Sequence, residues 1–265
     1  MKAKRLEART IPLEMLSEKQ INEMFNVYHK YYASVTKEVF VSDLSNKNHV
    51  IVLTDKIDGE IKGFSTILDY HFLLGGKKVK GVFSGDTIIE KEYWGGSALQ
   101  MAFIMYMFKE KLKRPFSPLY WFLISKGYKT YLLMANNFVE HYPRFEEQTP
   151  TEKKSIMDKF ATELYPQNYD PTSGLIKFEG IHDHLKGDVA PITDDMKIKN
   201  ERIKFFSETN NSWEVGTELV CLARFDLGLP FRYPMKTVKK VVNRQLKGLS
   251  NAFESFLAIF GVRRA

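Results

Sequence analysis

Three short apolar runs between residues 50 and 90 restrict the possible folds more than any other feature of the sequence. Each run has the length of a β-strand, and the runs are separated by the turn pairs Asp58-Gly59 and Gly75-Gly76. Glycine enters a tight turn without steric cost, so the chain can reverse at both points. The pattern predicts a three-stranded antiparallel meander, with strands at residues 50–54, 61–71 and 79–90.

Helical patterns occur on both sides of this meander. Ser17 and Gln20 form a capping-box pair ahead of apolar residues at helical spacing. After the meander, residues 97–113 are apolar around most of a helical circumference, which predicts a helix buried against the sheet. A strand at 119–124 and a helix at 128–138 are expected next, whereas 145–200 is polar and carries several prolines. A helical turn at 202–206 and a strand at 218–223 follow.

The composition is that of a folded intracellular protein. Of 265 residues, 44% are hydrophobic and 27% are charged, which is enough apolar material for a sizeable core. The one cysteine, Cys221, excludes an internal disulfide, and its apolar neighbours predict a buried structural thiol. The basic N-terminus lacks the apolar core of a signal peptide, and residues 101–108, the longest apolar run, are too few to span a bilayer. We therefore expect a cytoplasmic protein.

The net charge of +7 favours acidic partners. Nucleic acid, an anionic membrane, an acidic carrier protein and a phosphorylated cofactor all fit this charge, which does not choose among them.

The stretch from Gly85 to Leu99 places a strand, a small glycine loop and a helix start in succession. A helix N-terminus offers unpaired N–H groups and the positive end of the helix dipole, and Gly95 and Gly96 let the backbone approach an anion. Such a loop suits a pyrophosphate. A tight strand-to-helix turn without a ligand is the alternative.

The order of these elements resembles that of the GNAT superfamily of N-acyltransferases. The resemblance covers about residues 10–145 and implies an α/β fold, with a mixed, mostly antiparallel central sheet flanked by helices and a C-terminal helical extension. We expect residues 1–145 to form the acyltransferase core, 146–235 to complete the domain or shape the acceptor and acyl pocket, and 236–265 to form a basic amphipathic helix.

In this family the loop after the fourth strand cradles the phosphates of the thioester donor. Residues 93–98 fit the family loop in part, with Gly96 and Ala98 at its small positions, but no register places a cation at its first position. Some relatives take long acyl chains from an acyl carrier protein, whose acidity is compatible with the net charge of +7. The resemblance thus implies an acyl-CoA or acyl-phosphopantetheine donor. The donor-binding residues it implies are Ser84, Ile88, Trp94, Gly95, Gly96, Ser97 and Ala98.

Acyl transfer to an amine needs a base, oxyanion donors and an acid for the leaving thiolate. Asp86, just before the loop, is the candidate base, and a structural carboxylate is the alternative. Backbone N–H groups of residues 84–88 are the expected oxyanion donors. Tyr131 resembles the family's general acid, against the alternative of a buried structural tyrosine. His71 is a second candidate base.

Two further features of the sequence concern metal and membrane binding. His182 and His184 could chelate, but no further ligand lies at a recognisable spacing, so we expect no metal. Residues 238–260 carry an apolar helical stripe opposite a basic face. That helix either meets an anionic membrane or an acidic carrier, or packs on the core.

The sequence predicts an N-acyltransferase that moves an acyl group, such as a fatty acyl, from a thioester to an amine on a small molecule or peptide. The alternative is a non-catalytic module that docks a membrane or an acidic protein through the C-terminal helix. Nucleic-acid binding is not expected, because no nucleic-acid-binding fold pattern accompanies the basic residues.

Overall fold

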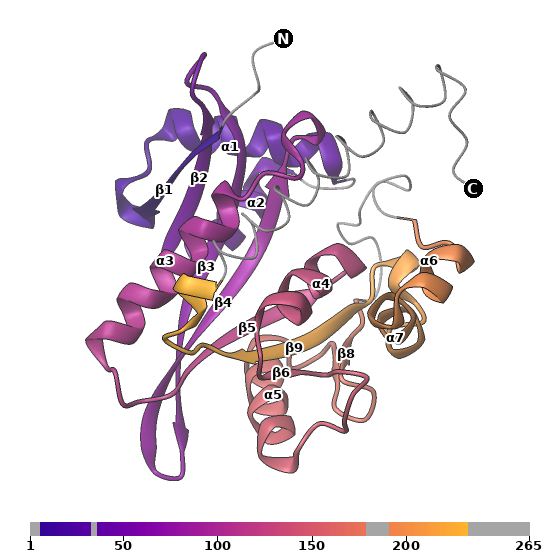
Figure 1. The fold of residues 1–265 in the computed structure, drawn as a ribbon. Helices are drawn as coiled ribbons and strands as arrows, with labels where there is room; N and C mark the ends of the chain where they lie inside the picture. The colour runs from indigo at the N-terminus through magenta and orange to yellow at the C-terminus, as the bar shows by residue number, and fades with distance from the viewer. Residues whose placement is uncertain (1–5, 33–35, 179–190, 233–265) are drawn as a thin grey trace, which may run out of the picture. The chain divides into compact units, whose positions relative to one another are not determined.

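Nine strands form one sheet in the computed structural model, which describes residues 6–32, 36–178 and 191–232 (Figure 1). The strand order is β1-β2-β3-β4-β5-β9-β8-β7, and β6 pairs with β9. Every pair is antiparallel except β4–β5, which is parallel. The expected mixed, mostly antiparallel sheet is therefore confirmed. The strands are β1 Leu6–Pro12, β2 His49–Asp55, β3 Ile61–Leu74, β4 Lys77–Ile89, β5 Leu119–Ser125, β6 His141–Tyr142, β7 Tyr169–Asp170, β8 Leu175–Ile176 and β9 Glu218–Arg224.

The predicted meander is formed by β2, β3 and β4, with glycines at positive φ in both turns. An additional strand, β1, pairs antiparallel along the whole of β2. No sequence pattern predicts β1, because apolar and polar residues alternate poorly in this edge strand. Its charged residues Glu7 and Arg9 form an ion pair at 2.9 Å.

Helices cover both faces of the sheet (Figure 1). On one face, the Phe64 ring of β3 lies 6.4 Å from the Tyr28 ring of α1, and Phe122 of β5 stacks on Phe160 of α5 at 4.1 Å. On the other face, Trp121 contacts Phe103 of α3. The helices are α1 Glu18–Tyr31, α2 Lys37–Ser45, α3 Ala98–Lys113, α4 Tyr128–Asn137, α5 Thr151–Leu164, α6 Asp194–Lys199 and α7 Glu201–Thr209. Short 3₁₀ helices occur at η1 Leu13–Met15, η2 Lys91–Tyr93 and η3 Trp213–Val215.

Local sequence patterns predicted some of the helices correctly but gave no indication of α5. The capping box that begins α1 is present, with both reciprocal bonds between Ser17 and Gln20. α3, α4 and β5 also lie where the sequence predicts. The polar segment 145–200, in contrast, contains α5. Pro150 precedes its first turn, where a proline costs no hydrogen bond. A narrow buried stripe supplies its packing: Ile156, Met157, Phe160 and Ala161.

The chain divides into two compact units, Met1–Asp226 and Leu227–Ala265. The sheet and all the helices above belong to the first unit. The basic amphipathic helix expected at 236–265 lies outside the described residues, as do His182 and His184. None of the helices described has the length and apolarity that a bilayer-spanning helix requires.

Gly63 offers a test of the close packing between β3 and β4. A Cβ at this position would lie 2.5 Å from Ile88 O and 3.1 Å from Leu53 Cδ1. Because a backbone oxygen in a strand ladder cannot move aside freely, we expect Gly63→Ala to lower the free energy of unfolding by about 1–3 kcal/mol, measured by urea denaturation. Gly127→Ala is the control, because a Cβ there meets no atom within 4 Å and φ is −139°. Equal losses in the two variants would contradict the close contact.

Candidate functional site

The parallel strands β4 and β5 separate at their carboxyl ends. Their shared ladder ends at the pair Ser84–Leu123. Beyond that pair, β4 continues against β3 as far as Ile89, while β5 continues against β9 as far as Ser125. Among the described strands, none pairs with the edge of β4 that faces β5 from Gly85 onward.

A β-bulge in β4 lies directly beyond the last shared pair. One β3 residue, Thr66, stands opposite two β4 residues, Gly85 and Asp86. Bulges bend a strand and are common next to active sites. A Cβ on Gly85 would lie 2.5 Å from Thr66 Oγ1 and 3.3 Å from Lys47 Cε, so a larger residue would require the Thr66 side chain to shift. Asp86, the candidate base, thus sits half-buried on a bent segment at the point where the strands part.

Two polar side chains beside the bulge, those of Thr66 and Lys47, were not predicted from the sequence to belong to the site. Thr66 Oγ1 is buried, and no hydrogen-bond partner is found for it within the described part of the chain. The Lys47 side chain is 8% exposed and pairs with Asp43 at 2.9 Å. A buried hydroxyl without a partner is uncommon in native proteins, so Thr66 adds a polar group that a ligand could satisfy.

Ser84 and Ile88 flank the bulge with side chains that are already committed. Trp121 Nε1 donates a hydrogen bond to Ser84 Oγ at 2.8 Å, and both side chains are buried. The Ile88 side chain is buried in the core beneath α1 and α2. If these two residues bind the donor as predicted, they can therefore do so only through their main-chain groups.

The glycine loop joins β4 to α3 through η2. Gly95 has a φ of +85°, which strains any residue with a Cβ, whereas a Cβ on Gly96 would make an ordinary contact with Tyr93 O at 3.5 Å. Ser97 is the N-cap of α3 but makes no side-chain capping hydrogen bond. The first turn, which begins at Ala98, therefore keeps N–H groups that a side chain often caps.

The loop after β5 meets the glycine loop. Gly127, the N-cap of α4, also provides no side-chain cap. Lys129 in the first turn of α4 places its ammonium 4.3 Å from the centre of the Trp94 ring, a cation–π contact. Lys126 pairs with Glu218 at 3.4 Å. The next strand–helix junction therefore places a cation beside the glycine loop.

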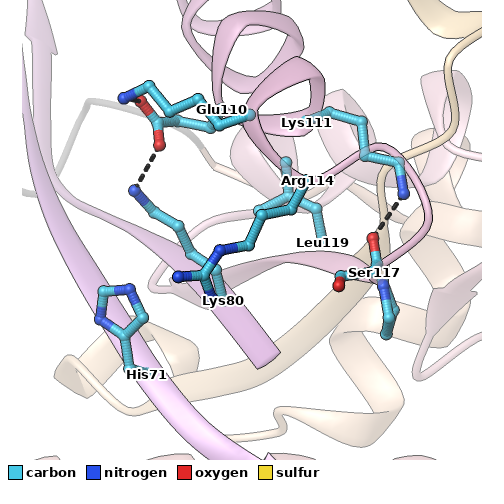
Figure 2. Close-up of a pocket in the computed structure, with 9 residues that line it drawn as sticks. His71, Lys80, Glu110, Lys111, Arg114, Ser117 and Leu119 are labelled. Atoms are coloured by element: carbon cyan, nitrogen blue, oxygen red, sulfur yellow. Dashed lines mark hydrogen bonds and ion pairs between the residues drawn. The ribbon is translucent and has the colours of Figure 1, made fainter. Parts of the chain in front are cut away.

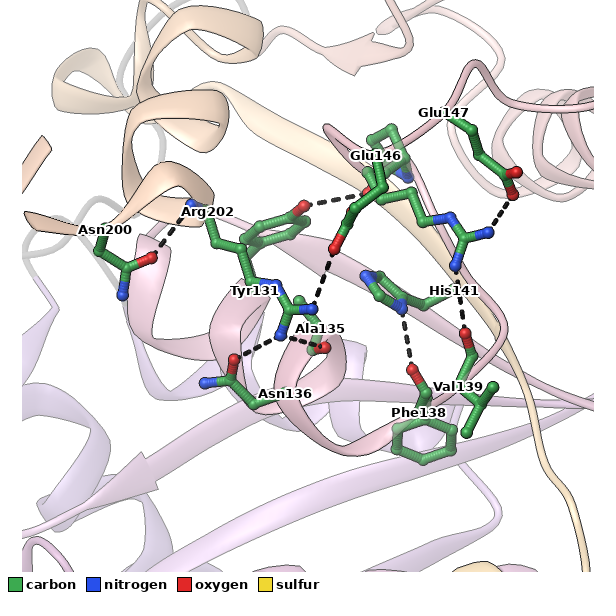
Figure 3. Close-up of polar contacts among 12 residues, drawn as sticks. Tyr131, Ala135, Asn136, Phe138, Val139, His141, Glu146, Glu147, Asn200 and Arg202 are labelled. Atoms are coloured by element: carbon green, nitrogen blue, oxygen red, sulfur yellow. Dashed lines mark hydrogen bonds and ion pairs between the residues drawn. The ribbon is translucent and has the colours of Figure 1, made fainter.

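Tyr131, the candidate acid, has a structural partner (Figure 3). Its side chain is 1% exposed, its ring lies 5.6 Å from that of Phe206 in α7, and its hydroxyl donates to Pro143 O at 3.1 Å. Burial raises the pKa of the phenol well above its usual range. The assignment of Tyr131 as the acid stays a prediction, and this geometry favours the alternative of a structural tyrosine.

A polar cluster beside Tyr131 ties α7 to the end of α4 (Figure 3). Arg202 donates to Ala135 O and Asn136 Oδ1 at 2.7 Å each, and pairs with Glu146 at 3.0 Å. His141 is buried, with Nδ1 at 2.9 Å from Phe138 O, so that nitrogen carries the proton and Nε2 is an acceptor. No partner for His141 Nε2 is found among the residues described.

The remaining candidates lie elsewhere or are inert. His71 pairs with Lys80, at the end of the β4–β5 ladder opposite the bulge. Cys221 is fully buried, and burial raises the pKa of its thiol, which confirms the structural interpretation. Within the described ranges, no group of three or more His, Cys, Asp and Glu side chains could hold a metal ion.

No protein-family model matches the sequence, and no curated protein matches it. Several solved structures that are similar to the chain are described as N-acetyltransferases or as a probable N-acyltransferase. One, from Enterococcus faecalis V583, is described as a conserved protein of unknown function and probable N-acyltransferase; it is 15% identical over 51% of this chain and 33% of its own, with a TM-score of 0.38. A GCN5-related N-acetyltransferase from Kribbella flavida is 14% identical over 52% of this chain and 34% of its own, with a TM-score of 0.36.

A third similar structure is the GNAT family N-acetyltransferase YhbS from Escherichia coli in complex with CoA. It is 13% identical over 48% of this chain and 66% of its own, with a TM-score of 0.34. The chain thus spans about a third of the length of the first two structures. These descriptions agree with the resemblance expected from the sequence.

Burial of His141 predicts a pH dependence of stability. Burial is the main cause that holds the pKa of this imidazole below its ordinary 6.5 in the folded protein. As the pH falls below that value, the unfolded chain takes up a proton that the native state does not. The free energy of unfolding should therefore fall, by at most about 1.4 kcal/mol per pH unit for one proton.

The measurement is urea denaturation between mildly acidic and neutral pH, in a His71→Asn background, because the pKa of His71 is also lowered, by burial and by Lys80. His141→Asn keeps a donor for Phe138 O and should flatten the dependence. His29→Asn, at an exposed position on α1, is the control and should leave it in place. An unchanged slope in His141→Asn would show that the buried imidazole is not its source.

Proposed function

We propose that this chain is an N-acyltransferase that moves an acyl group from a CoA or acyl-phosphopantetheine thioester to an amine. The observation that carries the proposal is the separation of β4 and β5 at a bulge that holds Asp86. The β4 edge that no described strand pairs with, a carboxylate on that strand and two helix N-termini without side-chain caps all follow the point where the two strands separate.

The residues present fit such a donor. A phosphopantetheine arm carries amide groups, which can hydrogen-bond to an open strand edge as an added strand does. Its phosphates suit the N-terminus of α3, where Ser97 provides no cap, with Lys129 close by on Trp94. The unsatisfied hydroxyl of Thr66 gives the bulge a further polar group for the ligand.

The reaction requires one bond to form and one to break. The amine nitrogen attacks the thioester carbonyl carbon, the carbon–sulfur bond breaks, and the thiolate leaves. In this proposal Asp86 takes the proton that the amine loses, and main-chain N–H groups of residues 84–88 stabilise the negative charge on the carbonyl oxygen. The thiolate takes up a proton from Tyr131 or from solvent.

An acyl carrier protein is the finer proposal for the donor. The net charge of +7 supports it, because carrier proteins are acidic. We also propose that the transferred group is a fatty acyl chain and that the acceptor is an amine on a small molecule or a peptide. The reaction is proposed to take place in the cytoplasm. Contact with an anionic membrane, and the alternative of a non-catalytic module, depend on residues 236–265, which lie outside the described ranges.

Replacement of Asp86 tests the proposed base. Asp86→Asn keeps the shape of the side chain but cannot accept the proton, so we expect kcat/KM to fall by about 10²–10⁴. Thiol release from acetyl-CoA, a long-chain acyl-CoA and an acyl carrier protein, each with a set of amines, measures the rate. Since Cys221 is buried, a thiol reagent reports the product rather than the folded protein.

Glu92→Gln is the matched control, because it removes an exposed carboxylate from the neighbouring η2 segment. Its rate should match that of the wild type, and both variants should unfold at the wild-type urea concentration. A wild-type rate in Asp86→Asn would remove Asp86 from the mechanism. Failure of all three donors to bind would reject the acyltransferase proposal itself.

Tyr131→Phe separates the structural role of this tyrosine from the catalytic one. Because the hydroxyl donates to Pro143 O in a buried site, its loss should lower the free energy of unfolding by about 1 kcal/mol and change kcat only a few-fold. A large loss of kcat, with a shift of the alkaline limb of the rate profile, would instead establish Tyr131 as the acid.

A further inference from the structure

A second feature lies at the opposite end of α3, where Figure 2 shows a pocket formed by the helix end, β3, β4 and the segment leading into β5. Its cavity measures about 130 Å³. A single water needs roughly 10–15 Å³ on this measure, so the pocket accepts a larger group. The lining residues are His71, Lys80, Glu110, Lys111, Lys113, Arg114, Ser117, Pro118 and Leu119.

The carboxylates in and beside this pocket already form ion pairs with lysine side chains. Glu110 binds Lys80 through one oxygen at 2.7 Å and Lys113 through the other at 2.5 Å. Asp69, which is not in the lining, pairs with Lys80 at 2.7 Å and accepts a hydrogen bond from Tyr106. These two carboxylates match the charges of Lys80 and Lys113, so the described residues supply no paired counter-charge for the two other cations of the lining, Lys111 and Arg114.

Lys111 is an unusual residue for this place. It is 9% exposed, and its ammonium donates one hydrogen bond, to Ser117 O at 2.5 Å. An ammonium has three donors, and the described residues supply no partner for the other two. Burial, together with the charge of Arg224, lowers the pKa of Lys111. A buried cation with open donors is stabilised by an anion.

Arg114 and His71 complete the basic lining (Figure 2). Within the described ranges, the Arg114 guanidinium has neither a hydrogen-bond partner nor an ion-pair partner. Burial and the nearby cations Lys80, Lys78 and Arg114 lower the pKa of His71, although Asp69 opposes them. The negative end of the α3 dipole favours cations in its last turn, but it provides no acceptor for this guanidinium.

We propose that this basic pocket binds a phosphate group, either as inorganic phosphate or as the phosphomonoester of a small molecule. A phosphate dianion balances the two unmatched charges. Its oxygens accept hydrogen bonds from Arg114, which is suited to bidentate contacts, and from the open donors of Lys111. The site is separate from the proposed acyl-transfer site and does not depend on that function.

The test is calorimetric titration of the full chain with sodium phosphate, against sodium chloride at equal ionic strength. We expect saturable binding of phosphate, weakened about tenfold in Arg114→Gln, because one charge-assisted contact is lost. Since Arg114 is exposed and its guanidinium makes no polar contact with the residues described, this substitution should not affect folding. Lys109→Gln is the matched control: it removes the same charge from an exposed position on α3 outside the pocket and should leave the affinity unchanged.

A local readout accompanies the titration. Phosphate in the pocket should raise the pKa of His71, followed by NMR of the imidazole, in the wild type but less in Arg114→Gln. Tighter binding of methyl phosphate than of inorganic phosphate would identify a phosphomonoester as the ligand, and the reverse would identify free phosphate. Absence of saturable binding, or equal weakening by Arg114→Gln and Lys109→Gln, would overturn the proposal.

Discussion

The parallel ladder between β4 and β5 joins the N-terminal meander to the strands of the C-terminal half, and it consists of only five register pairs. Gly81 lets the two strands pack closely, since a Cβ there would lie 2.3 Å from the Phe122 ring. Beyond Ser84 each strand has a different antiparallel partner, β3 or β9, and follows the twist of that partner. The separation of the two strands at the bulge is thus a consequence of strand pairing, and it requires no unusual residue other than Gly85.

Strong local signals made much of the sheet predictable from the sequence. The turn pairs Asp58-Gly59 and Gly75-Gly76 indicated the meander, and the capping box indicated the start of α1. β1 and α5 were missed for opposite reasons. β1 is an edge strand, partly exposed, with charged residues that mask its alternation. α5, which follows Pro150, buries only a narrow apolar stripe, so most of its residues are polar. In both cases the segment is stabilised mainly by packing or pairing with the rest of the protein rather than by its own sequence propensity.

The candidate site was predictable only where its residues are close in sequence. Asp86 and the glycine loop belong to one strand–loop–helix stretch, so their proximity follows from chain order. Lys129 reaches Trp94 from the next strand–helix junction, and Thr66 and Lys47 reach the bulge from other elements. Nothing in the local pattern indicates such contacts, because they depend on sheet order and register. Tyr131 shows the converse, since a residue of a type suited to acid catalysis has a hydroxyl that is hydrogen-bonded to the backbone, at Pro143 O.

Helix α3 has 16 residues, and its two ends belong to the two proposed sites. At a rise of 1.5 Å per residue the ends are about 24 Å apart, well beyond the roughly 8–10 Å over which charges in physiological salt act on each other. A single small ligand cannot bridge them, and an anion at one end is electrostatically screened from the other. Communication between the two ends would therefore have to be mechanical. A packed helix moves as a rigid rod, so a shift at the Arg114 end would displace the Ser97 end by a similar amount.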